Sequence, residues 1–263
     1  MRLPTYFISH GGGPWPWIPD WRAKFRKLEA SLAAIPGELP CTPKAVLVIS
    51  GHWTTQTSVV MSSAHPPMVY DYYGFPKETY DVVYPAPGAP EYAARTAALI
   101  QSAGYEARLD HKRGFDHGAF VPLYVMYPQA NMPMYQLSLM EGYDPAAHIA
   151  LGRALAALRD EGVLMIGSGL SYHNLGLFNA AAREPSGAFD QWLLETLSAP
   201  SEQRTKAMMN WTQAPCARLC HPNEDHLAPL FCALGAAQND RATRIYHEEG
   251  VFGGVSVSNY RFG

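Results

Sequence analysis

Histidines in glycine-containing turns are the residues of this 263-residue chain best suited to chemistry. Three of its ten histidines, His10, His52 and His173, follow strand-like apolar runs and lie within a few residues of glycine. Glycine lets the backbone turn sharply and leaves room beside a ligand. Imidazole is the commonest metal ligand and titrates near neutral pH. These positions therefore indicate a metal centre, an acid–base site, or both.

Two further histidines have acidic neighbours, since His117 follows Asp116 and His226 follows Glu224 and Asp225. Two or three histidines with one more histidine or carboxylate suit Zn²⁺ or non-haem Fe²⁺. The pattern favours a metal centre over separate structural histidines, but spacing does not choose the metal. Four histidines lack such settings and are expected at the surface: His65, His111, His148 and His247.

The elements that would position these histidines alternate along the chain. Apolar, β-branched runs predict strands at 5–8, 45–49, 132–139, 163–166, 244–246 and 255–257. Helical periodicity and capping residues predict helices at 21–35, 90–103, 144–158, 188–198, 202–211 and 226–237. Such alternation predicts an α/β layer architecture, and no convincing domain boundary divides the chain. Ligands bind at the carboxyl ends of the strands in such sheets, so the histidines are expected to converge there.

Composition narrows the class of protein. The chain is 48% hydrophobic, 16% charged and carries a net charge of −3, with no basic block for nucleic acid. No apolar run approaches the ~20 residues that span a bilayer, and the first residues lack the layout of a signal peptide. The four cysteines contain no C-x-x-C pair, which is typical of reduced cytosolic thiols. We therefore predict a cytoplasmic protein with no nucleic-acid or membrane partner; its oligomeric state stays open, a homodimer included.

A long segment between Pro66 and Pro90 combines prolines with tyrosines and Phe75. Irregular segments of this length are usually functional. The segment is either a flap over the core or an aromatic wall and lid for a planar substrate.

Taken in order, the motifs resemble those of the class III (LigB-type) extradiol ring-cleavage dioxygenases, and more closely the single-chain DOPA-dioxygenase-like branch. Together they cover nearly the whole chain. The motifs are Ser9 to Pro14, Ser50 to Trp53, Tyr70 to Pro76, Tyr84 to Gly88, Gly114 to Gly118, Tyr172 to Asn174 and Asp225 to Leu230.

The resemblance implies a single α/β domain over residues 1–263, with a central mixed, mostly parallel sheet flanked by helices. It also implies a mononuclear non-haem Fe²⁺ centre, which Zn²⁺ can also occupy. His10, His52 and His226 match the metal-binding positions. Asp225 is the alternative third ligand, because two-chain relatives use a carboxylate there. His173 matches the acid–base histidine, and His117 matches a histidine that touches substrate or dioxygen.

The substrates implied by the resemblance are a catechol and O₂. The enzyme would add the oxygen to the catechol and open its aromatic ring. The aromatic residues expected to contact the catechol are Trp53, Tyr72 and Phe75. Two other functions use the same histidines: a Zn²⁺-dependent hydrolase of amides or esters, and a Memo-type metal-binding interaction protein without dioxygenase activity. The identity of the catechol stays open, because no sequence feature places a cation such as Lys112, Arg113 or Arg183 in the pocket.

Overall fold

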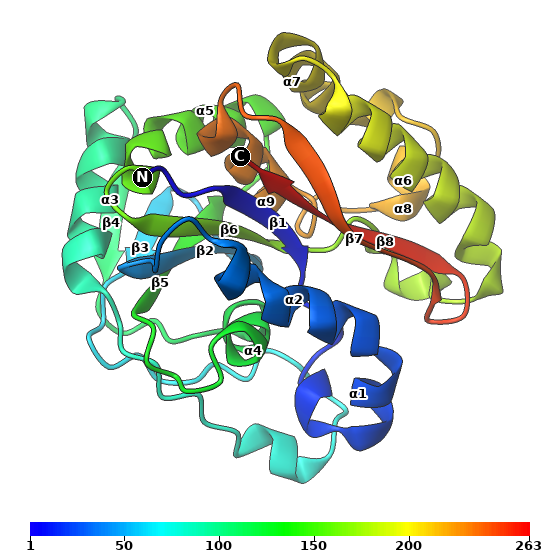
Figure 1. The fold of residues 1–263 in the computed structure, drawn as a ribbon, viewed down its shortest axis with the longest axis horizontal. Helices are drawn as coiled ribbons and strands as arrows, with labels where there is room; N and C mark the ends of the chain where they lie inside the picture. Colours follow the sequence, from blue (N-terminus) through cyan, green and yellow to red (C-terminus); the bar gives the residue numbers. More distant parts are fainter.

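One eight-stranded sheet runs through the computed structural model, which describes residues 1–263 (Figure 1). Its strand order is β4-β3-β5-β2-β6-β1-β8-β7. The strands are β1 (Thr5–Ser9), β2 (Ala45–Thr55), β3 (Ser58–Met61), β4 (Ala107–Asp110), β5 (Met134–Met140), β6 (Val163–Gly169), β7 (Ala242–Val251) and β8 (Val255–Phe262).

The four central strands of the sheet, β5, β2, β6 and β1, are parallel to one another. Antiparallel pairs flank them, because β8 pairs with both β1 and β7, and β3 pairs with β5. Ala45 to Ile49 of β2 are fully buried, as a strand covered on both faces requires. The predicted mixed, mostly parallel α/β sheet is therefore confirmed, with four carboxyl ends at one edge.

Helices cover both faces of this sheet (Figure 1). The helix α9 lies against β1, β2 and β6 with α5 beside it, whereas α4 lies against β2 and contacts α2. All ten residues of α9 are buried, as expected for a helix that is apolar on every side. The helices are α1 (Pro19–Lys24), α2 (Arg26–Glu38), α3 (Pro90–Ser102), α4 (His117–Met126), α5 (Pro145–Ala154), α6 (Arg183–Ser198), α7 (Ser201–Met209), α8 (Ala217–Cys220) and α9 (Ala228–Ala237).

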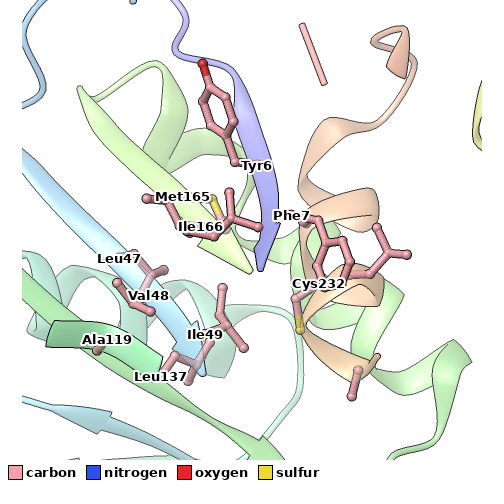
Figure 2. Packing of buried hydrophobic residues seen from close by; sticks show 14 of the residues in the cluster. Tyr6, Phe7, Leu47, Val48, Ile49, Ala119, Leu137, Met165, Ile166 and Cys232 are labelled. Carbon is pink, nitrogen blue, oxygen red and sulfur yellow. The ribbon is translucent and has the colours of Figure 1, made fainter. Parts of the chain in front are cut away.

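A single core of 69 buried hydrophobic residues joins the sheet to its helices. Figure 2 shows Tyr6 and Phe7 of β1 pointing in different directions, with Phe7 close to Cys232 of α9. Successive side chains of a strand alternate between the two faces of the sheet, so both layers of helices pack on the same strands. This packing fixes the strand ends that carry the histidines.

Three local predictions differ from the structure. The strand expected to end at Ile49 continues to Thr55, and its pairing with β5 shifts register between Ile49 and Thr54. The helix expected over 21–35 is two helices that meet at Phe25. The helix expected from His226 begins at Ala228, so His226 lies in the loop before it.

His148 was expected at the surface but is fully buried at the start of α5. Its Nδ1 donates to the Asp144 carbonyl at 2.8 Å, and its Nε2 accepts from the Met140 amide at 3.1 Å. The surface prediction was wrong because this ring connects the first turn of α5 to the end of β5.

No helix of the structure combines the length and apolar character needed to cross a membrane. The cytoplasmic location and the homodimer stay predictions.

Candidate metal centre

The five histidines singled out by the sequence lie together at the carboxyl edge of the central strands. His10 follows β1, His52 lies in the last part of β2, and His173 follows β6. His117 is the first residue of α4, and His226 lies just before α9. The ring centroids of His52 and His117 are 3.9 Å apart, and those of His173 and His226 are 3.4 Å apart. The parallel strands thus bring together side chains more than 200 positions apart in sequence.

Three of these rings direct their Nε2 atoms at a common point. The His52 Nε2 atom lies 3.3 Å from the His10 Nε2 and 3.1 Å from the His226 Nε2. A divalent ion held at ~2.0–2.1 Å from each nitrogen requires the nitrogens to be about 3.0–3.4 Å apart. These three side chains therefore fit a metal ion as they stand.

Burial keeps these three rings neutral. It lowers the pKa of His10 and of His52 well below the usual value, and it lowers the pKa of His226 to about 4. Neighbouring histidines lower the pKa of His10 and His52 further, because a second positive charge nearby would be repelled. Neutral imidazoles have the free electron pair that metal binding needs.

Two carboxylates stand behind the cluster. The Asp71 Oδ2 atom lies 3.2 Å from the Nδ1 of His52, and the Asp225 Oδ2 atom lies 2.9 Å from the Nδ1 of His226. Asp225 accepts a hydrogen bond from the Nδ1–H of His226, and the charge of Asp71 favours a proton on the Nδ1 of His52. The Nε2 electron pair of each ring is then free for a metal. Asp225 therefore lies in the position of an orienting carboxylate, which favours His226 over Asp225 as the third ligand.

The same two carboxylates also hold the other two histidines. Asp71 Oδ1 accepts hydrogen bonds from the Nδ1 and the backbone amide of His117 at 2.9 and 3.0 Å. Asp225 Oδ1 lies 3.6 Å from the Nδ1 of His173. Burial alone would raise the pKa of both carboxyl groups, but hydrogen bonds from the histidines lower it overall. Each carboxylate thus joins one ring of the Nε2 cluster to one ring beside it.

Two glycines allow the loop that carries His226 to approach the strand ends. A Cβ atom on Gly169 would lie 2.1 Å from the carbonyl oxygen of His226, and one on Gly51 would lie 2.9 Å from that of Asp225. The same His226 carbonyl accepts a hydrogen bond from the Leu170 amide at 3.0 Å. Only glycine permits this contact between backbones.

A buried acid, Asp116, connects the elements beneath the cluster. It caps α4 by accepting from the Ala119 amide, and it accepts hydrogen bonds from Ser50 and Gln136, both at 2.7 Å. Its Oδ2 also lies 3.0 Å from Arg113. Burial raises the pKa of Asp116, and the charge of nearby Asp71 raises it further. These contacts fix β2, β5 and the first residue of α4 relative to one another.

A cavity of about 390 Å³ opens beside the cluster, and all five histidines line it. Tyr72 and Phe75 line it as well, in agreement with their predicted place near substrate. Trp53 does not line the cavity; its ring is buried, and the Arg113 guanidinium lies 5.0 Å from the ring centroid. Because β2 continues past His52, successive side chains alternate faces, and Trp53 points away from the cavity.

Sequence reasoning assigned no role to several residues of the site. Asp71 contacts two histidines in the structure. In the sequence it lies within the motif Tyr70 to Pro76, and that membership was a partial signal of its role. No sequence signal marked Trp21, Phe178 and Phe252 as aromatic lining of the cavity, because these residues come from three distant segments.

A buried cluster of neutral imidazoles beside an aromatic cavity, at the carboxyl edge of a parallel sheet, is the arrangement of a metal-dependent α/β enzyme. Comparison with known proteins defines the family. Residues 20–263 match the family model described as the catalytic LigB subunit of aromatic ring-opening dioxygenase. The chain therefore belongs to the LigB family.

Relatives match over almost their whole length. The chain is 38% identical to a 4,5-DOPA dioxygenase extradiol of Beta vulgaris, covering 98% of this chain and 96% of that protein. It is 36% identical to the dioxygenase tasH of Hapsidospora irregularis, over 99% of this chain and 85% of that protein. The crystal structure of an uncharacterized Escherichia coli K12 protein superposes with a TM-score of 0.80 at 28% identity, covering both chains completely.

Proposed function

We propose that this protein is an extradiol dioxygenase that opens the ring of a catechol with O₂ at an Fe²⁺ ion held by His10, His52 and His226. The observation that carries the proposal is the convergence of three neutral Nε2 atoms at 3.1 and 3.3 Å beside an aromatic cavity. Membership of a ring-opening dioxygenase family supports the reaction class. The names of the relatives support a catechol as the ring that is opened.

Bound Fe²⁺ would supply a place where catechol and O₂ meet and a path for electrons between them. Zn²⁺ accepts the same nitrogen ligands but has no redox chemistry, so iron is the metal that fits this reaction. The overall reaction breaks one ring C–C bond next to the diol and adds both atoms of O₂, giving a ring-opened semialdehyde acid.

His173 is the proposed general base and acid. Its ring lines the cavity and has a carboxylate, Asp225, 3.6 Å from Nδ1. A base at this place accepts a proton from a catechol hydroxyl and returns it as the ring opens, and the carboxylate stabilises the imidazolium between these steps.

His117 is proposed to stabilise negative charge that develops on oxygen. Its Nδ1–H donates to Asp71, so only the doubly protonated ring, whose positive charge that carboxylate balances, has a second N–H to donate from Nε2 to substrate or dioxygen. Donors held in place before the reaction stabilise such charge without the cost of reorganisation. The planar catechol ring would lie against the aromatic side chains of Tyr72 and Phe75.

Anaerobic loading tests the proposal. The metal-free protein is loaded with Fe²⁺ without air, mixed with a catechol, and then exposed to O₂. We expect uptake of O₂ together with a yellow product, and no product after loading with Zn²⁺. Failure of the iron-loaded protein to open any catechol, with iron bound, would contradict the proposal.

A further inference from the structure

The cavity beside the histidine cluster has no lysine or arginine in its lining. Apart from the five histidines, Asp71 is the one lining residue whose side chain is ionised at neutral pH. That carboxylate is occupied by the hydrogen bonds of His117 and by its contact with His52. Apart from the histidines, which the proposed function already uses, the lining therefore has no side chain that could carry a positive charge for an anionic group on the substrate.

The cations that the sequence suggested for this role lie elsewhere. Arg113 binds Asp116 and stacks over Trp53, outside the cavity lining. Lys112 is exposed and does not line the cavity, and Arg183 lines a separate surface hollow beside Glu184. None of them lines the cavity beside the histidines.

Aromatic rings from four segments cover one side of the cavity instead. The ring of Trp21 in α1 lies 5.3 Å from that of Phe75 and 6.3 Å from that of Phe252, in the turn between β7 and β8. Phe178 lies 4.8 Å from Phe252 and completes this wall. We call these four residues the aromatic wall.

The cavity edge is apolar as well. Tyr73 is 87% exposed and Leu175 is 69% exposed, although both line the cavity. A substrate that enters the cavity would therefore pass the apolar edge first and then contact the aromatic wall.

We infer that the catechol opened by this protein carries an uncharged, apolar substituent and no carboxylate. The inference rests on the proposed function, names its substrate class, and sets that substrate apart from the carboxylate-bearing DOPA in the names of the relatives. A volume of about 390 Å³ lies within the ~300–1,000 Å³ of cavities for drug-sized ligands, so there is room for a substituent beside the ring. A carboxylate placed against the aromatic wall would lose its water and gain no partner, which is strongly unfavourable.

Three catechols with tails of similar shape in the para position test this inference. Propylcatechol has an apolar tail, dihydrocaffeate ends the same tail in a carboxylate, and the methyl ester of dihydrocaffeate removes the charge but keeps the size. We expect kcat/KM for propylcatechol to exceed that for dihydrocaffeate by about 100-fold or more, the discrimination available when a polar group enters an apolar pocket. The methyl ester should resemble propylcatechol. Equal or better cleavage of dihydrocaffeate, or of DOPA, would overturn the inference and leave ring opening intact.

A substitution at the cavity edge provides a second test. Leu175→Arg places a cation at an exposed lining position, where an ion pair with dihydrocaffeate is worth up to about fivefold in kcat/KM. Leu175→Gln is the matched control, and we expect no such gain from it. An equal gain in both variants, or in neither, would count against the absence of a cation as the cause of discrimination.

Binding without O₂ separates this inference from the proposed function. Calorimetric titration of the iron-loaded protein under anaerobic conditions should give tighter binding of propylcatechol than of dihydrocaffeate. If that order holds but O₂ opens neither ring, the substrate class stands and the proposed reaction fails. If dihydrocaffeate binds as tightly, the inference fails whatever O₂ does.

Discussion

Asp71 and Asp225 each bind two histidines, and this pairing is the main feature of the site at the scale of single residues. One oxygen of each carboxylate faces a ring of the Nε2 cluster, and the other faces His117 or His173. A carboxylate behind a ligand fixes which ring nitrogen carries the proton. Metal binding and acid–base chemistry are therefore coupled through the same two side chains.

Replacing Asp71 by asparagine tests this coupling. An amide keeps the size but removes the charge that holds the Nδ1 protons of His52 and His117, so we expect iron affinity to fall about 10- to 100-fold. Asp81→Asn, an exposed position in the same loop, is the control and should bind iron as the unchanged protein does. Competition with a chelator measures the affinity. Unchanged affinity in Asp71→Asn would show that the carboxylate does not orient a ligand.

The two kinds of histidine should respond differently to removal. His173→Ala should keep its iron and lose about 10²- to 10⁴-fold in turnover, the usual contribution of a general acid–base group. His52→Ala should lose the iron itself, because His52 Nε2 is close to both other Nε2 atoms. Elemental analysis and O₂ uptake measure the two effects. Ring opening at the normal rate in His173→Ala would remove its proposed role.

At this scale the sequence pointed to the histidines and to Asp225, but not to Asp71. Glycines and acids beside His10, His52 and His226 gave a local signal for the cluster. The contact of Asp71 with two histidines depends on the path of an irregular segment, which no periodicity describes. Trp53 was misplaced for a related reason: its direction depends on the continuation of β2 beyond Ile49.

At the scale of elements, the loop before α9 is held against the ends of β2 and β6 by contacts between backbones. Gly169, the last residue of β6, lies where the His226 carbonyl passes. The position of His226 therefore depends on a residue that has no side chain.

Gly169→Ala tests this contact. The added methyl group would lie 2.1 Å from a backbone oxygen, so the loop must move, and we expect a loss of about 1 to 3 kcal/mol in the free energy of unfolding. Iron affinity should fall too, because His226 moves with its carbonyl. Gly187→Ala, inside α6 with no atom near its added Cβ, should instead stabilise by roughly 0.5–1 kcal/mol. Urea unfolding of both variants provides the comparison.

Most of the long elements could be predicted because their patterns are local. The apolar run at 45–49 and the periodicity at 90–103 both correspond to elements of the structure. The short strands β3 and β4 were not predicted, since four residues each give little pattern and they pair with segments distant in the sequence. The break at Phe25 was missed because the apolar spacing continues across it.

At the scale of the whole molecule, buried histidines make stability depend on pH. His221 is fully buried and donates through Nε2 to the Ser171 carbonyl at 3.0 Å. Burial lowers its pKa from 6.5 to about 3. The unfolded chain therefore binds a proton below about pH 6.5 that the folded protein excludes, and stability falls as the pH decreases from there toward the folded pKa.

This linkage predicts the behaviour of His221→Gln, whose amide can still donate to Ser171. Between about pH 6.5 and pH 4.5, the decline in unfolding free energy should become shallower by up to about 1.4 kcal/mol per pH unit. Urea unfolding of the metal-free protein at several pH values measures the slope, and His65→Gln at an exposed position is the control. If both variants keep the original slope, protonation of His221 does not limit acid stability.

The fold and the reaction class could be predicted from the sequence because the motifs cover nearly the whole chain in one order. The substrate class could not, because it depends on which side chains are absent from a cavity formed by distant segments. Trp21, Phe75, Phe178 and Phe252 come together only once the β7–β8 turn lies beside α1.

Labelled dioxygen tests the central claim most directly. The iron-loaded protein is given propylcatechol and O₂ enriched in heavy oxygen, and the product is examined by mass spectrometry after brief reaction. The proposed function predicts a ring-opened product that contains both atoms of one labelled O₂, apart from exchange of the aldehyde oxygen with water. A ring-opened product whose carboxylate carries no labelled oxygen, or uptake of O₂ without any ring-opened product, would contradict a dioxygenase.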